Sequence, residues 1–260
     1  MNAELLSIYD DQLRITAEVS SSRSISRVGP LYLGVYPNRG SITYRDLDGH
    51  TGTALDALIQ RAVSFFAEQT ELAFFEWKTR GHDAPADLGD RLRSAGLVPD
   101  PVETVMFGEA AALAVDVPLP EGVRVHRIED LADPALDGAV ALQDAVFGRG
   151  GPSAAGVRDR LRDQDNEFWV AVADGRVVTA GRLEPVTETQ CAGLWGGVTD
   201  PDWRGRGLYR ALVAARARSA LAKGYRFLYS DCTDMSRPIL QRSGLVAITT
   251  TTPYLWTRPD

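Results

Sequence analysis

Apolar residues recur along this chain with two periodicities, one typical of helices and one typical of strands. Residues 53–68 carry apolar side chains at spacings of three and four, which places them on one face of a helix. Residues 168–173 and 177–183 are short apolar runs joined by Asp174-Gly175, a pair typical of a tight hairpin turn. The pattern therefore predicts an α/β (α+β) protein.

The first half of the chain predicts a small α/β arrangement. Helices are expected at 5–13, 53–68 and 86–94, and strands at 31–36, 41–47, 72–77 and 103–107. Residues 108–120 are then rich in alanine and proline, and this shift in composition predicts a linker. We expect a first domain over residues 1–115 and a second over residues 120–260.

The second half predicts a longer series of elements. Strands are expected at 123–128, 168–173, 177–183, 192–199, 227–231 and 246–256, and helices at 134–147, 154–164, 208–223 and 236–242. A glycine-rich break at 148–152 separates the first two helices. The predicted order is β-α-α-β-β-β-α-β-α-β.

Within this half, one stretch joins a strand, a tight turn and a helix without a spacer. The turn is Arg204-Gly205-Arg206-Gly207. The first N–H groups of a helix have no intrahelical partner and lie at the positive end of the macrodipole, so they attract phosphate. The two glycines let the backbone approach a ligand closely, and the two arginines add donors that stay charged. The turn therefore predicts a pyrophosphate site.

This turn and the order of elements around it resemble the GNAT superfamily of N-acyltransferases. The family signature is Q/R-x-x-G-x-G/A; Arg204 and Gly207 match it, and Tyr209 stands where the family usually keeps a small residue. The resemblance covers roughly residues 123–256. It implies a GNAT fold, with a central mixed, mostly antiparallel sheet flanked by helices, and acetyl-CoA as the acyl donor.

The resemblance also implies where the coenzyme binds. In the family its pantetheine arm pairs with the backbone of the fourth strand, here residues 196–199. The implied cofactor-binding residues are Gly197, Val198, Thr199, Arg204, Gly205, Arg206, Gly207, Leu208, Tyr209 and Thr233. The backbone N–H of Gly197 or Val198 is the implied donor to the thioester oxyanion.

Acyl transfer to an amine benefits from a base, because an alkylammonium with a pKa near ~10.4 is almost wholly charged at neutral pH. The candidates are Glu184 and Asp231, which end two strands, although a solvated strand-end charge explains either carboxylate equally well. Leu240 stands where the family often has a tyrosine that protonates the leaving thiolate. Either the thiolate leaves unaided, or Ser236 or Tyr254 takes that role.

A short sequence pattern in the first half recurs in the second half. Residues 92–98 and 240–246 share the pattern L-x-x-x-G-L-V, each time after a helix–strand pair and before a strand, so the order helix–strand–helix–strand occurs twice. Residues 47–53, where the helix of the first half starts, lack an Arg/Gly turn. We infer a degenerate GNAT-like first half, while a common helix C-cap explains the shared pattern equally well.

Composition narrows the choice of partners. A net charge of -7 argues against a general nucleic-acid binder. Two cysteines and three histidines show neither a disulfide framework nor a zinc spacing, so no metal is expected. The first residues do not read as a leader and no run reaches membrane-spanning length, so we expect a cytoplasmic protein without a membrane partner.

The leading hypothesis is an acetyl-CoA-dependent N-acetyltransferase that moves the acyl group to a primary amine by direct attack. Its acceptor is a small molecule or a protein lysine, and its first half shapes or covers the acceptor cleft. The alternative is an acyl-CoA-binding or regulatory module that has lost its chemistry. The sequence indicates neither the acceptor nor the oligomeric state.

Overall fold

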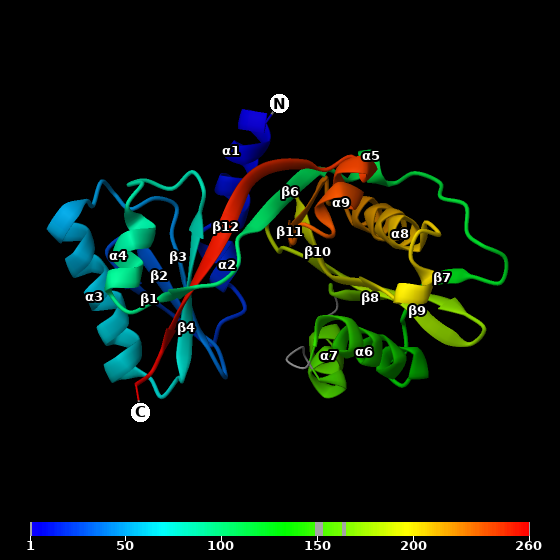
Figure 1. Cartoon of the computed structure of the whole chain (residues 1–260), viewed down its shortest axis with the longest axis horizontal. Coiled ribbons are helices and arrows are strands. Elements are labelled where there is room, and N and C mark those ends of the chain that lie inside the picture. Colours follow the sequence, from blue (N-terminus) through cyan, green and yellow to red (C-terminus); the bar gives the residue numbers. More distant parts are fainter. Residues whose placement is uncertain (1, 149–152, 163–164, 260) are drawn as a thin grey trace. The chain divides into compact units, whose positions relative to one another are not determined.

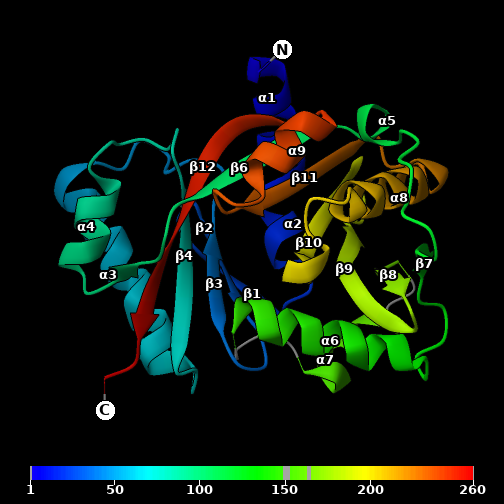
Figure 2. The ribbon, with the colours of Figure 1, turned by 45° about the vertical axis from the view of Figure 1, so that its right-hand side comes forward.

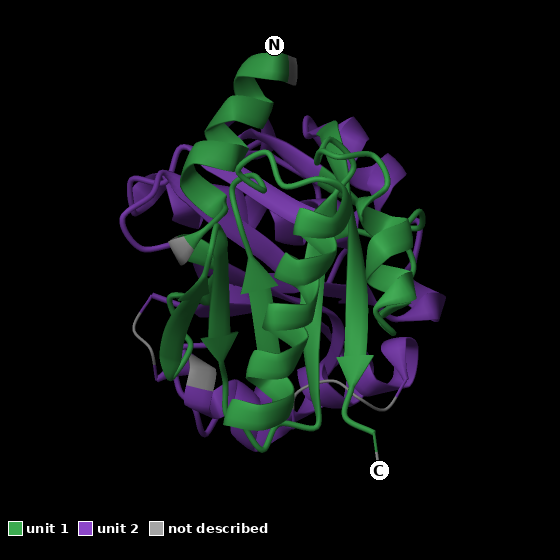
Figure 3. Cartoon of the chain, turned by 90° about the vertical axis from the view of Figure 1, so that its left-hand side faces the viewer, with its two compact units in different colours: residues 1–105, 231–235, 247–260 green, residues 106–230, 236–246 purple. Residues whose placement is uncertain are grey.

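The computed structural model describes residues 2–148, 153–162 and 165–259 (Figure 1). Contacts divide the chain into two units (Figure 3). Unit 1 comprises residues 1–105, 231–235 and 247–260, and unit 2 comprises residues 106–230 and 236–246. Most of the predicted break at 148–152 and the end of the helix predicted at 154–164 lie outside the described residues.

Unit 1 is a sheet with helices on both faces. Its elements are α1 (Asn2–Leu13), α2 (Thr16–Val19), β1 (Ser24–Val28), β2 (Leu31–Val35), β3 (Gly40–Thr43), α3 (Gly52–Gln69), β4 (Phe74–Arg80), α4 (Leu88–Ser94), β5 (Val98–Pro99) and most of β12 (Val246–Thr257). The strand order is β1-β2-β3-β4-β12, with β5 beside β12. These pairs are antiparallel except β3 and β4, which run parallel.

Helix α3 covers one face of the unit 1 strands (Figure 3). Its buried side chains join Leu33, Phe75 and Trp77 in one apolar core, and the Phe75 ring stacks on Phe66 of α3 at 4.5 Å between centroids. Gly34 faces the other way, because neighbouring strand residues alternate. A Cβ at Gly34 would lie 2.9 Å from the Val19 side chain, so α2 covers the opposite face.

Unit 2 holds the remaining elements. They are most of β6 (Glu103–Glu109), α5 (Ala110–Leu113), β7 (Arg124–Arg127), α6 (Pro134–Phe147), α7 (Ala154–Leu161), β8 (Glu167–Ala173), β9 (Arg176–Pro185), β10 (Cys191–Thr199), the 3-10 turn η1 (Pro201–Trp203), α8 (Leu208–Ala222), most of β11 (Phe227–Cys232) and α9 (Arg237–Ser243). The strand order is β6-β11-β10-β9-β8-β7. Strands β7 to β10 pair antiparallel, and β10 and β11 pair parallel.

Opposite faces of the unit 2 sheet carry different helices (Figures 1 and 2). Val170 lies in an apolar cluster with residues of α6 and α7, whereas Ala171 lies in a second cluster with Leu208 of α8. This alternation follows the period of two along β8. The predicted fold class, a mixed and mostly antiparallel sheet flanked by helices, is confirmed.

Two details differ from, or add to, the sequence-based expectations. The linker expected at 108–120 contains the end of β6 and the short helix α5, which Ala110 ties to the sheet by donating its N–H to the Arg226 carbonyl at 2.8 Å. The strand expected at 246–256 forms as β12, which pairs antiparallel with β4, with Tyr254 opposite Trp77.

The repeated L-x-x-x-G-L-V pattern ends a helix in both places. Gly96 and Gly244 adopt positive φ angles of 88° and 116°. In each copy the N–H of the following leucine bonds back to the first leucine of the motif, Leu97 to Leu92 at 3.0 Å and Leu245 to Leu240 at 3.1 Å. The shared pattern is therefore the sequence of a glycine C-cap.

Candidate active site

The Arg/Gly turn lies exposed at the start of α8. Gly205 and Gly207 have φ angles of 75° and 79°, in the left-handed region that favours glycine. A Cβ at Gly205 would meet no atom within 4 Å, so the outer side of the turn is open. Buried Leu208 anchors the helix behind it, at 1% exposure. The turn presents its backbone to solvent on a fixed base.

Both arginines of the turn are tethered through backbone carbonyls. Arg204 Nε donates to the Thr199 carbonyl at 3.3 Å, and Arg206 donates to the Asp202 carbonyl at 3.1 Å while its guanidinium lies 4.6 Å from the centre of the Trp203 ring. Neither guanidinium forms an ion pair with a described carboxylate. Two positive charges therefore stand at the helix end where N–H groups lack intrahelical acceptors.

Strands β10 and β11 separate next to this turn. Their parallel pairing runs from Cys191 opposite Phe227 to Gly193 opposite Tyr229, and β10 then continues to Thr199. Beyond this pairing, the Ser230 hydroxyl donates to the Leu194 carbonyl at 2.9 Å. The backbone of residues 195–199 thus has no registered partner in β11 among the described residues.

The same part of β10 bulges. Its register with β9 shifts between Trp195 and Val198, and Gly196 has a φ of 58°. Gln143 of α6 donates its Nε2 hydrogen to the Gly196 carbonyl at 2.6 Å. The glycines at 196 and 197 therefore form a turned segment rather than regular strand.

Tyr209 points inward from the first turn of α8 onto this bulge. A Cβ at Gly197 would lie 2.7 Å from the Tyr209 ring, so the ring covers the glycine directly. The Tyr209 side chain also hydrogen-bonds Arg216, which is fully buried and donates to the Arg182 carbonyl at 2.9 Å. Burial lowers the pKa of Arg216 to about 10, and Tyr209 partly offsets that effect. The large residue at the signature position is accommodated by packing inward.

Glu184 lies beside β10 on the face that also carries Trp195 and Tyr229. Glu184 is opposite Gly193 in β9–β10 pairing, and Gly193 is opposite Tyr229, so these positions share a face. The Glu184 carboxylate accepts from Arg182 Nε at 2.7 Å and is 28% exposed. The Trp195 and Tyr229 rings meet edge to face, with centroids 5.4 Å apart.

Sequence reasoning did not single out Trp195, Tyr229, Arg182 or Gln143. Trp195 could have been noticed, because it lies two residues from Gly193 and so shares its face. Arg182 could also have been noticed, because it lies two residues before Glu184 in β9, whereas Tyr229 and Gln143 come from elements distant in sequence. The structure therefore brings together Glu184, an aromatic pair and the β10 bulge.

Asp231, the second candidate base, belongs to unit 1 and is 3% exposed. It forms an ion pair with Lys78 of β4. Burial would lower the pKa of Lys78, but the charges of Asp231 and Glu18 outweigh burial and raise it above its usual value. Asp231 is thus held by a cation, and its catalytic role stays a prediction.

The remaining candidates are scattered. Thr233 is exposed after β11, and Ser236 immediately precedes α9. Leu240 is fully buried in α9, and Tyr254 is 5% exposed in the apolar core of unit 1, with its hydroxyl against Gly89 of α4. Tyr254 therefore packs as a structural aromatic residue.

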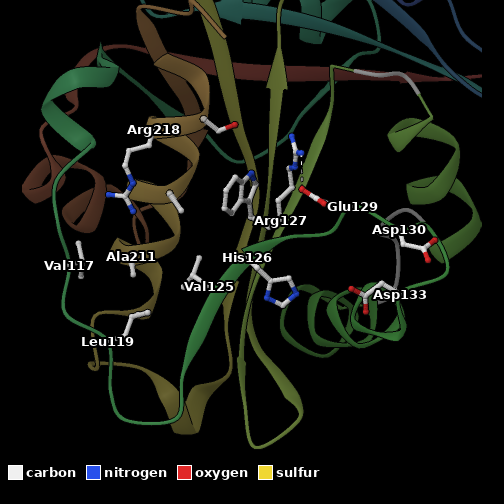
Figure 4. Close-up of a pocket in the computed structure, with 13 residues that line it drawn as sticks. Val117, Leu119, Val125, His126, Arg127, Glu129, Asp130, Asp133, Ala211 and Arg218 are labelled. Atoms are coloured by element: carbon white, nitrogen blue, oxygen red, sulfur yellow. Dashed lines mark hydrogen bonds and ion pairs between the residues drawn. The ribbon is translucent and has the colours of Figure 1, made fainter. Parts of the chain in front are cut away.

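A separate groove of about 970 Å³ runs along β7 and α8 in unit 2 (Figure 4). Val117 and Leu119 line one side, and Glu129 and Asp133 lie on the other (Figure 4). The residues that line it do not include any of the predicted site residues. Val117, which lines this groove, lies close to Gly207 of the Arg/Gly turn, since a Cβ at Gly207 would be 3.8 Å from it.

Residues 133–241 match the family described as Acetyltransferase (GNAT) family, so this part of the chain is a GNAT acetyltransferase domain. The match begins just before α6 and ends in α9, and it contains the Arg/Gly turn and the bulge. A search of curated proteins found none that matches the chain.

Solved structures share the fold over nearly the whole chain. A GCN5-related N-acetyltransferase from Kribbella flavida is 16% identical with a TM-score of 0.67, covering 100% of this chain and 96% of its own. One from Sphaerobacter thermophilus is 18% identical with a TM-score of 0.64, covering 89% and 78%. A tandem GNAT protein from the clavulanic acid biosynthesis pathway is 14% identical with a TM-score of 0.61, covering 99% and 96%. Unit 1 therefore also has a GNAT-like fold.

No three His, Cys, Asp or Glu side chains in the ranges 2–148, 153–162 and 165–259 are grouped so that they could hold a metal ion. No helix in that part of the chain combines the length and the apolar character needed to span a bilayer.

Proposed function

We propose that this protein is an acetyl-CoA-dependent N-acetyltransferase whose reaction takes place in unit 2. The observation that carries the proposal is the exposed Arg/Gly turn beside the point where β10 and β11 separate. Phosphate donors and unpaired strand backbone are what the two ends of the coenzyme require. The acceptor is a primary amine on a small molecule or a protein.

Binding of acetyl-CoA is divided between the turn and the strand. Arg204, Arg206 and the N–H groups that open α8 hold the pyrophosphate, with Gly205 and Gly207 allowing close approach. The backbone of residues 197–199 holds the pantetheine arm. Thr233 follows β11 and adds a hydroxyl as a further contact.

Transfer proceeds by direct attack of the amine on the thioester carbonyl. Glu184 takes the proton from the amine, and the N–H of Gly197 or Val198 stabilises the negative charge on the carbonyl oxygen. The carbon–sulfur bond then breaks and the thiolate leaves, being a fair leaving group with a pKa near ~8.5. Ser236 is a candidate proton donor to it, since Leu240 offers none.

Direct attack also agrees with the state of the cysteines. Cys191 and Cys232 are both buried thiols. Burial raises the pKa of Cys191 to about 12, so this thiol stays protonated at neutral pH and is a poor nucleophile. A chain with only two cysteines and no disulfide framework is usual in reducing compartments, and we therefore propose a cytoplasmic location.

The proposal is tested by replacing one arginine of the turn. Arg204→Ala removes a charged phosphate contact worth roughly 1.5 to 3 kcal/mol, so CoA affinity should fall tenfold or more in calorimetry. Arg124→Ala on exposed β7 is the matched control and should leave CoA affinity unchanged. Equal affinity in both variants would remove the basis of the assignment.

The role of Glu184 is tested through pH. Glu184→Gln should lower turnover most at low pH, where neutral amine is scarcest and a base matters most. The measurement is the kcat of Glu184→Gln divided by the kcat of the wild type, taken between roughly pH 6 and pH 9, where both the buffers and the amine substrate can be used. A ratio that stays constant across pH would exclude Glu184 as the base.

A second candidate function is an acyl-CoA-binding or regulatory module without chemistry. The observation in its favour is Leu240, which is fully buried where the family often has a tyrosine. Release of free thiol from acetyl-CoA in the presence of a panel of amines separates the two. Binding of acetyl-CoA with no thiol release would favour the module.

A further inference from the structure

The peptide bond between Gly196 and Gly197 is held by a side chain from another element. Gln143 of α6 is 6% exposed, and its Nε2 lies 2.6 Å from the Gly196 carbonyl oxygen. The carbonyl and the N–H of one trans peptide point in opposite directions. A bond that fixes the Gly196 carbonyl toward α6 therefore fixes the Gly197 N–H away from α6.

Glycine at these two positions makes such an anchor necessary. Glycine dihedral angles are the least restricted, so a Gly-Gly peptide rotates easily unless something holds it. Gly196 adopts a φ of 58°, and a Cβ there would lie 2.6 Å from Gln143 Nε2 and 2.7 Å from an Arg182 nitrogen. Tyr209 covers Gly197 from α8. The bulge is thus held from both faces of the sheet.

Gln143 is also an exception on its own helix. The other buried residues of α6 are Leu136, Ala139 and Val140, all apolar. Burying an amide costs free energy unless it is hydrogen-bonded, so the bond to Gly196 is what offsets this cost. The apolar face of α6 is interrupted where it crosses the bulge.

We infer that Gln143 is a positioning residue for acyl transfer, which sets the direction of the Gly197 N–H that donates to the thioester oxygen. This inference rests on the proposed function. An oxyanion donor acts because it is oriented before the reaction begins, and loss of that orientation slows the chemical step more than it weakens binding. Gln143 itself touches neither substrate.

Two substitutions test the inference. Gln143→Leu keeps the volume and removes the donor, and should lower kcat on the order of 10²-fold with CoA affinity changed less than about twofold. Gln143→Glu can donate to the Gly196 carbonyl only while its carboxyl is protonated. Its kcat relative to wild type should therefore rise as pH falls, whereas the relative kcat of the Leu variant stays constant.

The measurements are steady-state kcat and KM with an amine that wild type accepts, CoA affinity by calorimetry and a thermal melt for each variant. Asp144→Asn, one position along α6 on its exposed side, is the matched control and should keep wild-type kcat. If Gln143→Leu keeps the wild-type kcat, or if the relative kcat of Gln143→Glu does not change with pH, the inference is overturned while the proposed function stands. A wild-type protein that acetylates no amine overturns the proposed function, and this inference with it.

Discussion

Each of the two units contains a parallel strand pair, β3 with β4 in unit 1 and β10 with β11 in unit 2, and the two pairs end differently. In unit 1, β3 and β4 are registered over three residue pairs, from Gly40 opposite Phe75 to Ile42 opposite Trp77. In unit 2, β10 and β11 are also registered over three pairs. Each pair is connected through a loop and a long helix, α3 or α8. The same local architecture therefore occurs twice in the chain.

In unit 1 the end of the pair is filled by the unit's own side chains. Thr43, the residue after the last registered pair in β3, donates its hydroxyl to Glu18 of α2. Glu18 also forms an ion pair with Arg80, the last residue of β4. Arg80 is fully buried in its side chain and further donates to the Tyr9 hydroxyl at 3.1 Å. Helices α1 and α2 thus supply the groups that close this pair.

The charges of Arg80 and Lys78 keep the Glu18 carboxylate ionised. Burial alone would raise the pKa of Glu18, but Arg80 and Lys78 outweigh burial and hold that pKa below its usual value. The carboxylate therefore stays ionised at neutral pH. Unit 1 thus completes its strand pair with its own side chains, whereas we propose that the pair in unit 2 is completed by the coenzyme.

The loops after β3 and β10 differ in charge more than in backbone. Gly49 and Gly52 have positive φ angles of 72° and 53°, as the glycines of the Arg/Gly turn do. The neighbours of Gly49 and Gly52 include Asp46 and Asp48, and no arginine stands between residues 46 and 53. The stretch 46–53 in unit 1 thus combines positive-φ glycines with acidic rather than arginine neighbours.

The largest expected effect follows from removing the Glu18 carboxylate, which pairs with Arg80 at the end of β3 and β4 in unit 1. Glu18→Gln leaves the Arg80 guanidinium buried without its carboxylate, so the free energy of unfolding should fall by about 3 kcal/mol. Urea unfolding followed by circular dichroism measures it. Glu71→Gln, on an exposed loop residue, is the control and should be neutral. A neutral Glu18→Gln would show that the closure contributes little.

The next prediction compares the effect of a new negative charge at the start of α8 with its effect at the start of α3. Arg206→Glu places a negative charge beside the pyrophosphate site, and CoA affinity should fall about 100-fold, which corresponds to about 2.8 kcal/mol. Thr53→Glu places a negative charge in the exposed first turn of α3 and should leave CoA affinity as it is. Equal losses from both variants, measured by calorimetry, would mean that the loops do not differ in the way proposed.

The smallest expected effect concerns Tyr209, which packs against Gly197 of β10 where β10 and β11 separate. Tyr209→Phe keeps the ring over Gly197 and removes the hydroxyl that bonds to buried Arg216, so the free energy of unfolding should fall by about 1.5 kcal/mol. Tyr225→Phe in the same unit serves as the control, with a change within about 0.5 kcal/mol. Wild-type stability of Tyr209→Phe in urea unfolding would argue against a structural role for the hydroxyl.

The sequence by itself determined the features that short segments encode. Helix α6 begins and ends where predicted, because Asp133 caps its first turn, Pro134 opens it and Gly148 ends it. The Arg/Gly turn was recognisable for the same reason, since its glycines, its charges and the helix behind it are adjacent in the chain. The GNAT resemblance followed from these local signals and from the order of elements.

Only the tertiary structure decided which distant segments meet. Strand β12 pairs with β4, Glu18 closes the end of β3 and β4, and Gln143 anchors the peptide after Gly196. Periodicity predicts that a helix has a buried face, but it does not say which strand that face covers or which carbonyl a buried amide reaches. Such contacts join residues tens of positions apart, and they form only when the whole sheet sets the distances between them.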